Sequence, residues 1–354
     1  MKHYPSASSL LLENVLNGTK NKHIFVYGSK NQSLPSYSMV KYYDISKWEE
    51  HQYYGTGGTR DKSVVENPDD GNLYYFKTSL KKKVIDYKYE FWSEILASEI
   101  GASLGLDILH YDVAWKEDRL GCLSKSMIDS QKEELQEGYK WLTGFDSHYN
   151  INDKDAYTFQ IIERMLTSRF KKEEFIRDII EIIVFDSIIG NEDRHQENWS
   201  IIVTNKLVDK SSIFRRRKMI SETSYSFAPI YDSGSSMGRE LTDAKVEQML
   251  TDKVQLEAYI KRGQSEIHWE GERGKQKHLD LISKIASSGY KDTVAEIIES
   301  IRLNYNSATI VDIINKVDEC LPEEHSILKI PQKRKEFLIK LVSLRFNKLF
   351  ELQL

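Results

Sequence analysis

The sequence predicts an α+β chain with two lobes, a small β-rich lobe that carries one helix and a large, mainly helical lobe. Two patterns lead to this prediction. Strand-like aromatic runs, interrupted by one amphipathic helix, lie within residues 51–128, whereas helical periodicity dominates residues 129–354. The 354 residues, 40% hydrophobic and 29% charged, are enough for both lobes. Residues 1–50 give few structural signals and form an N-terminal segment of unclear role.

Charge and cysteine content exclude several classes of protein. The net charge of −4 argues against a protein that coats nucleic acid or an anionic membrane, so we expect no direct nucleic-acid binding. Cys122 and Cys320 lie far apart, which predicts neither a disulfide framework nor a zinc site. No run reaches the roughly 18 apolar residues of a membrane span, and no Sec-type export signal is visible. We therefore expect a soluble protein of a reducing, cytoplasmic compartment, with no membrane partner.

The small lobe is predicted from a Gly-rich turn, strands and a helix in a fixed order. The helix is expected because apolar residues recur at steps of four from Trp92 to Leu104. Polar residues that follow Met127 indicate a hinge, so this lobe should end near Ile128. The expected elements are a turn at residues 55–58, a strand at 72–78, a helix at 89–104 and a strand pair at 110–115 and 120–127.

The Gly-rich turn has the composition of a phosphate-covering loop, because glycine lets backbone N–H groups approach oxyanions. Its sequence GTGGTRDK, residues 55–62, matches neither GxxxxGK[ST] nor GxGxxG, so an isolated turn of this kind would be an ordinary one. Lys77 on the next strand and Glu90 on the helix favour a functional loop, because such a pair holds nucleotide phosphates in protein kinases. The expected nucleotide-binding residues here are Gly57, Gly58, Thr59, Arg60, Lys62, Lys77 and Glu90.

The large lobe is predicted from helices that surround one polar loop. Ile179 to Phe185 leave little polar face, so the helix that contains them should be buried. After the loop, a strand, a polar excursion with the basic run at residues 215–218, and a returning strand are expected. The expected ranges are helices at 156–166, 174–189, 278–286, 293–303 and 333–349, strands at 199–203 and 227–231, and the excursion at 206–224.

The polar loop, IGNEDRHQENWSII over residues 189–202, places Asp193, His195 and Asn198 at spacings that suit phosphoryl transfer. Asp193 can accept the proton of an acceptor hydroxyl, while Asn198 and the later Asp232 offer the oxygen ligands that magnesium prefers. His195 is expected to orient the loop or the Asp193 side chain. The predicted cofactors are ATP and Mg²⁺, and the predicted catalytic residues are Asp193, His195 and Lys77.

Each of these segments also has a purely structural interpretation. Gly190 and Asn191 could simply end the preceding helix, and Asp232 before Ser-Gly could form an Asx turn. The basic run at residues 215–218 is typical of a solvated loop tip, or otherwise of a site for an acidic or phosphorylated partner. The order of the segments, from lysine and glutamate to the two aspartates, favours the functional interpretation.

Together the segments resemble the HipA-like serine/threonine kinases, whose large lobe carries NxDxHxxN and a later Tyr/Phe-Asp, here residues 191–198 and Tyr231-Asp232. The resemblance covers roughly residues 50–354. It implies a two-lobed protein-kinase-like fold, Asp193 as catalytic base, Asn198 and Asp232 on magnesium, Lys77 on phosphate, and backbone near Ser124 and Ser126 against adenine.

The resemblance also implies bacterial origin and a protein substrate with a serine or threonine acceptor. Some members are toxins with an antitoxin partner, and some autophosphorylate a serine in the Gly-rich loop, where this chain has about Gly55. Only some fifty residues precede the loop, fewer than in larger members, so a free-standing kinase or secreted effector is an equal expectation. The alternatives are a phosphatidylinositol-kinase-like lipid kinase, which shares Asp-Arg-His-x-x-Asn, and a nucleotide-binding pseudokinase scaffold.

Overall fold

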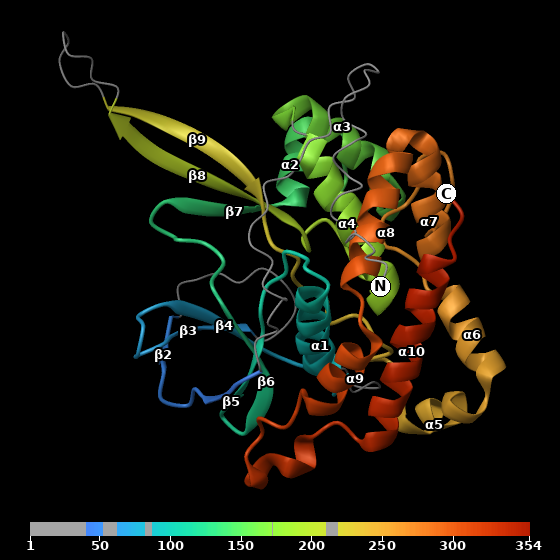
Figure 1. Ribbon diagram of the computed structural model, residues 1–354. Coiled ribbons are helices and arrows are strands. Elements are labelled where there is room, and N and C mark those ends of the chain that lie inside the picture. The colour runs from blue at the N-terminus through green and yellow to red at the C-terminus, as the bar shows by residue number, and fades with distance from the viewer. Residues whose placement is uncertain (1–39, 52–61, 82–86, 172, 210–218) are drawn as a thin grey trace, which may run out of the picture. The chain divides into compact units, whose positions relative to one another are not determined.

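The computed structural model describes residues 40–51, 62–81, 87–171, 173–209 and 219–354 (Figure 1). Internal contacts divide the chain into Met1–Leu34 and Pro35–Leu354, and every described residue belongs to the second unit. The strand expected at residues 24–27 and the basic run at residues 215–218 lie outside the described residues.

The small lobe is built on a six-stranded sheet with the order β1-β5-β6-β4-β3-β2. All neighbouring strands are antiparallel except β1 and β5. β1 and β2 fall within the first fifty residues, so part of that segment belongs to the sheet. The strands are β1 (Tyr42–Asp44), β2 (Glu49–Glu50), β3 (Lys62–Glu66), β4 (Leu73–Thr78), β5 (Asp112–Lys116) and β6 (Arg119–Lys125).

The predicted helix of the small lobe is α1 (Glu90–Ser103), and nearly all of its residues are buried. It packs against β4 and β6 and also against α9 (Ser307–Lys316) of the large lobe. The apolar residues at steps of four are buried, as predicted; they are Trp92, Leu96, Ile100 and Leu104. The same burial encloses the carboxylates of Glu90 and Glu94, which therefore need partners inside the protein.

The second sheet has the order β7-β8-β9 and belongs to the large lobe. Its strands are β7 (Glu133–Glu137), β8 (Ser200–Asp209) and β9 (Met219–Phe227). The prediction of a polar excursion over residues 206–224 was wrong where β8 and β9 continue as one antiparallel ribbon, from Ile201 opposite Phe227 to Asp209 opposite Met219. The predicted strand at residues 227–231 was also misplaced, because after Phe227 only Ile230 makes an isolated bridge, with Ile108.

Helices make up the rest of the large lobe. α4 is buried along most of its length, as predicted, and packs against α3, α7, α8 and α10. Thr158 caps α3 by accepting a hydrogen bond from the Ile161 N–H, so this helix begins later than expected. None of the described helices combines the length and apolar character needed to cross a membrane. The helices are α2 (Gly138–Phe145), α3 (Phe159–Phe170), α4 (Glu173–Ile189), α5 (Asp243–Thr251), α6 (Lys253–Arg262), α7 (His278–Ile285), α8 (Lys291–Asn304), α9 and α10 (Gln332–Phe350).

Candidate active site

The polar loop begins where α4 ends, at Gly190. Gly190 adopts a left-handed φ of 67°, and a Cβ there would lie 1.2 Å from Nη1 of Arg345, so only glycine fits. The N–H groups of Gly190 and Asn191 both donate to the Asp186 carbonyl, at 2.7 and 3.0 Å. These residues therefore do end the helix, and in doing so they direct the chain into the loop.

Arg194 is the buried centre of the loop, with 1% of its surface exposed. Its guanidinium donates to both carboxylate oxygens of Asp186, at 3.0 Å from Nε and 2.9 Å from Nη2. Nη1 also donates to the carbonyls of Asn198 and Tyr231. Burial alone would lower the pKa of Arg194, but the Asp186 carboxylate outweighs burial and raises it. Arg194 thus joins α4, the loop and the segment before Asp232.

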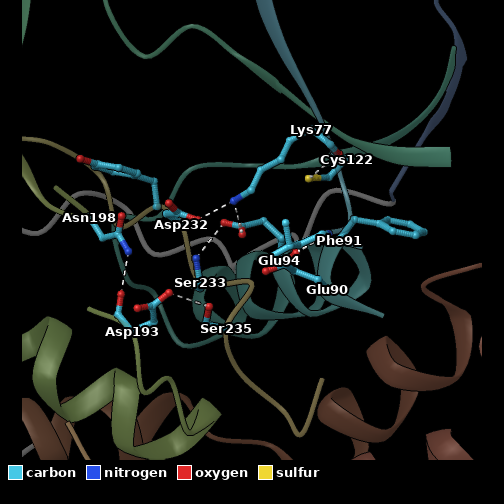
Figure 2. Close-up of polar contacts among 12 residues, drawn as sticks. Lys77, Glu90, Phe91, Glu94, Cys122, Asp193, Asn198, Asp232, Ser233 and Ser235 are labelled. Carbon is cyan, nitrogen blue, oxygen red and sulfur yellow. Dashed lines mark hydrogen bonds and ion pairs between the residues drawn. The ribbon is translucent and has the colours of Figure 1, made fainter. Parts of the chain in front are cut away.

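Asp193 and Asn198 are held together within the loop. The Asn198 amide nitrogen donates to the Asp193 carbonyl at 2.7 Å, and the Ser235 hydroxyl donates to Asp193 Oδ2 at 3.1 Å (Figure 2). Asn198 is buried, whereas Asp193 is partly exposed. A carboxylate that is held by one hydroxyl and reaches solvent can receive a proton from an incoming hydroxyl group.

His195 contacts its own loop. Its Nδ1 accepts a hydrogen bond from the Glu197 N–H at 3.3 Å and lies 3.5 Å from Glu197 Oε2. The hydrogen bond to the Asp193 carboxylate comes from Ser235. His195 was expected to orient either the loop or the Asp193 side chain, and these contacts fit the first of these roles.

Lys77 links the two lobes at the centre of the site. Its ammonium on β4 lies 2.5 Å from Asp232 Oδ1 and 3.3 Å from Glu94 Oε2, between the two carboxylates in Figure 2. The Lys77 and Asp232 side chains are only 11% and 19% exposed. The other oxygen of Glu94 accepts a hydrogen bond from the Ser233 N–H at 2.8 Å. One carboxylate of α1 therefore contacts both the sheet and the segment that carries Asp232.

The predicted pairing of Lys77 with Glu90 was wrong, because the helix glutamate at Lys77 is Glu94, one turn later. Glu90 accepts a hydrogen bond from the Leu80 N–H at 2.7 Å and lies 2.5 Å from Nη1 of Arg239. Glu90 and Glu94 lie on the same face of the helix, and the sequence does not show which of them reaches the lysine.

The segment around Asp232 needs an unusual backbone. Asp232 itself has a left-handed φ of 53°, a conformation that aspartate tolerates better than most residues. At Gly234 a Cβ would lie 2.8 Å from Glu94 Oε2, so glycine permits the close approach to α1. The left-handed residue of this segment is thus Asp232, and Gly234 is needed because a side chain there would meet Glu94.

Two neutral groups lie beneath these charges. Burial, followed by the Glu94 carboxylate, raises the pKa of the Tyr111 hydroxyl and of the Cys122 thiol, so both stay protonated at neutral pH. The charged groups in the described part of this cluster are the Lys77 ammonium and the carboxylates of Glu94 and Asp232.

The remaining predicted residues are only partly described. Lys62 lies directly opposite Lys77 across β3 and β4, so both side chains project from the same face of the sheet. Ser124 lies in β6 opposite Tyr75, and the Ser126 N–H donates to the Leu73 carbonyl at 2.8 Å, so that N–H is engaged within the sheet. The loop residues outside the described residues are Gly57, Gly58, Thr59 and Arg60.

The donor set fits a magnesium nucleotide. Among the described residues, no group of three or more His, Cys, Asp or Glu side chains is arranged to hold a metal by itself. Magnesium commonly binds through one or two side-chain oxygens and completes its shell with phosphate and water, which Asp232 and Asn198 suit. The Lys77 ammonium beside Asp232 is a cation of the type that contacts phosphate oxygens in kinases.

Comparison with known proteins supports the fold. No protein-family model matches the chain. The chain is 22% identical over 229 residues to the serine/threonine-protein kinase CtkA of Helicobacter pylori strain J99, and the match covers 63% of each protein. The match thus spans less than two thirds of that relative's length.

The crystal structure of the H. pylori proinflammatory kinase CtkA covers 90% of this chain and 99% of its own, with a TM-score of 0.68 and 19% identity. The HipA structure from a Shewanella oneidensis MR-1 toxin–antitoxin complex gives a TM-score of 0.47 with 10% identity over 87% of this chain, too low to establish a shared fold. The chain is therefore related in fold to CtkA, and the predicted kinase-like fold, with its β-rich lobe and helical lobe, is confirmed.

Proposed function

We propose that the chain is an ATP- and Mg²⁺-dependent protein kinase that phosphorylates serine or threonine hydroxyls. The observation that carries the proposal is the cluster of Lys77, Glu94 and Asp232, which joins a strand lysine, a helix glutamate and a metal-type carboxylate from both lobes. The similarity to a serine/threonine-protein kinase supports the same reaction class.

Each residue of the site has a separate role in the proposed phosphoryl transfer. Lys77 holds phosphate oxygens, and Asp232 with Asn198 holds the metal, so that Lys77 and Asp232 exchange their contact with each other for contacts with the ligand. Glu94 keeps the Lys77 ammonium in place through its 3.3 Å contact. Bound ATP supplies the phosphoryl group, and Mg²⁺ neutralises the charge that develops on it.

Asp193 accepts the proton of the attacking hydroxyl. Its carboxylate is partly exposed, and the Ser235 hydroxyl fixes one of its oxygens at 3.1 Å. Arg194 acts through the backbone, because it holds the carbonyls of Asn198 and Tyr231, which precedes Asp232. The proton acceptor and the metal ligands are in this way held at a fixed spacing.

Incubation with labelled ATP and magnesium tests the proposal. Asp193→Asn should lower phosphate transfer to itself or to lysate proteins by about 100- to 10,000-fold while nucleotide binding is retained. Asp280→Asn, the same chemical change at an exposed position of α7, is the matched control and should leave transfer nearly unchanged. Full activity in Asp193→Asn would refute the assignment, and tight nucleotide binding without turnover in the wild type would favour a pseudokinase.

The acceptor and the partners are proposed from the resemblance. A panel of protein and phosphatidylinositol substrates separates the protein kinase from the lipid kinase, and phosphosites found by mass spectrometry would name the acceptor residue. An antitoxin partner, autophosphorylation of the Gly-rich loop, and a toxin or secreted-effector role stay predictions.

A further inference from the structure

A groove of about 760 Å³ opens beside the first turn of α1, away from the candidate active site. Its walls are the end of β4 with the residues after it, the start of α1, the turn between β5 and β6, and the end of the 3₁₀ helix η4 (Glu323–Leu328) with the residues that follow it. We call it the α1 groove.

Among the described residues that line the α1 groove, cations outnumber carboxylates. They are Lys81, Lys88, Arg119 and Lys329, beside the carboxylate of Asp118. Two of these cations already have carboxylate partners, because Lys88 lies 2.9 Å from Asp243 of the large lobe and Arg119 lies 3.2 Å from Glu117. Lys81 and Lys329 are therefore the cations that would attract an acidic ligand.

The same groove exposes apolar surface. Its aromatic wall comes from Tyr89, Phe91 and Trp92, which are largely buried in the lobe beneath it. Two further lining residues, Ile327 and Leu328 of η4, are 89% and 39% exposed. Large aliphatic side chains next to a concave surface are typical of a place where an apolar anchor inserts.

The groove is connected directly to the helix that completes the active site. The Phe91 N–H donates to the Ser79 hydroxyl at 3.1 Å, and Glu90 accepts from the Leu80 N–H at 2.7 Å. Ser79 and Leu80 line the groove. Glu94, one turn further along α1, contacts Lys77 and the Ser233 N–H. A ligand that fills the groove therefore braces the position of Glu94.

We propose that the α1 groove binds an acidic peptide segment of a partner protein, with one or two large apolar side chains as anchors, and that binding stabilises the active position of α1. The regulatory half of this proposal rests on the proposed kinase function, whereas the binding half does not. A partner segment fits better than residues 1–39 of this chain, which contain four lysines and one glutamate and are therefore basic.

A peptide-binding assay with the full chain tests whether the α1 groove binds an acidic segment. The probe is a library of short fluorescein-labelled peptides with acidic residues around two varied apolar positions, and a lysine-substituted library is the control. We expect binding to the acidic library, and hydrogen exchange of residues 79–103 should slow when the best peptide is added. No binding by the acidic library, or protection only elsewhere, would overturn the proposal.

Two variants test whether the peptide binds in the α1 groove. The double charge reversal Lys81→Glu, Lys329→Glu should weaken binding of the best peptide about tenfold or more, and Ile327→Asp should weaken it as well. These side chains lie at the surface of the groove, and thermal unfolding would confirm that the variants fold. Lys291→Glu, an exposed reversal at the start of α8, is the matched control and should bind like wild type. Equal binding by all variants would refute the site.

Measurement of the phosphate-transfer rate tests separately whether peptide binding stabilises the active position of α1. The best peptide should raise the rate of phosphate transfer by the wild type and leave the rate of the Lys81→Glu, Lys329→Glu variant unchanged. Binding without a change in rate of an active enzyme would overturn the regulatory role alone, whereas an inactive wild type that still binds the peptide would contradict only the proposed function. Binding of phosphatidylserine vesicles that is lost in the Lys81→Glu, Lys329→Glu variant, with no binding of any peptide, would assign the groove to a lipid surface and overturn the proposal.

Discussion

Replacement of Arg194 by methionine should destabilise the chain strongly, because it leaves the carboxylate of Asp186 buried without its cation. The guanidinium makes two hydrogen bonds to Asp186 and also donates to two carbonyls and to the Ser233 hydroxyl. Removal of one partner from a buried ion pair costs about 3–5 kcal/mol. With an m-value of about 3 kcal/mol/M, the urea midpoint should fall by about 1–1.7 M.

The assay is urea unfolding followed by tryptophan fluorescence, with two further variants. Arg164→Met removes an arginine with similar bidentate geometry, but Arg164 and Glu270 are 48% and 53% exposed, so the cost should stay below about 1 kcal/mol. Asp186→Leu combined with Arg194→Met removes both buried charges and should cost less than Arg194→Met alone. An Arg194→Met variant as stable as Arg164→Met would refute this account of how the loop is held.

Three further predictions concern other parts of the molecule. Glu94→Gln should raise the KM for ATP about tenfold, whereas Glu90→Gln should change it less, because Glu94 is the glutamate at the β4 lysine; steady-state kinetics of both variants checks the order. Gly190→Ala should lower the free energy of unfolding by about 2 kcal/mol or more, because the new methyl group would clash with the Arg345 guanidinium of α10 and the backbone has a positive φ. Gly274→Ala has only the positive φ to accommodate and should lower it by about 1 kcal/mol in the same unfolding assay. Burial, followed by neighbouring carboxylates, raises the pKa of Asp178 from 3.8 to about 7, so this group contributes stability at low pH that is lost as the pH rises from about 4 through 7; Asp178→Asn should reduce that fall in the thermal midpoint, and unchanged pH dependence would contradict it.

Segments with continuous apolar periodicity could be predicted from the sequence. α1, α4 and α10 were each placed within one or two residues, because burial of one face determines both the pattern and the helix. The full length of the β8–β9 ribbon was missed because polar residues such as Asn205 and Thr223 interrupt the apolar pattern, whereas the backbone pairing continues through them.

The candidate site was only partly predictable for a different reason. The spacing of Asp193 and Asn198 predicted that the two residues lie together because both belong to one loop, and the structure links them directly. The choice between Glu90 and Glu94 depends on how α1 packs, which a local pattern does not contain. Ser235 and Asp186 gave no signal of their own, since a lone hydroxyl or a carboxylate in an apolar helix acquires its role only through the fold.

The burial of Arg194 and Asp186 has a consequence for experiments in different buffers. Dissolved salt screens exposed charges over about 8–10 Å of solution but reaches an enclosed pair much less. The spacing between the loop and the segment before Asp232 should therefore be nearly independent of ionic strength. If the rate of phosphate transfer changes with added sodium chloride, the change should come from weaker contacts with the nucleotide or with a binding partner. It should not come from loss of the contacts that hold the loop.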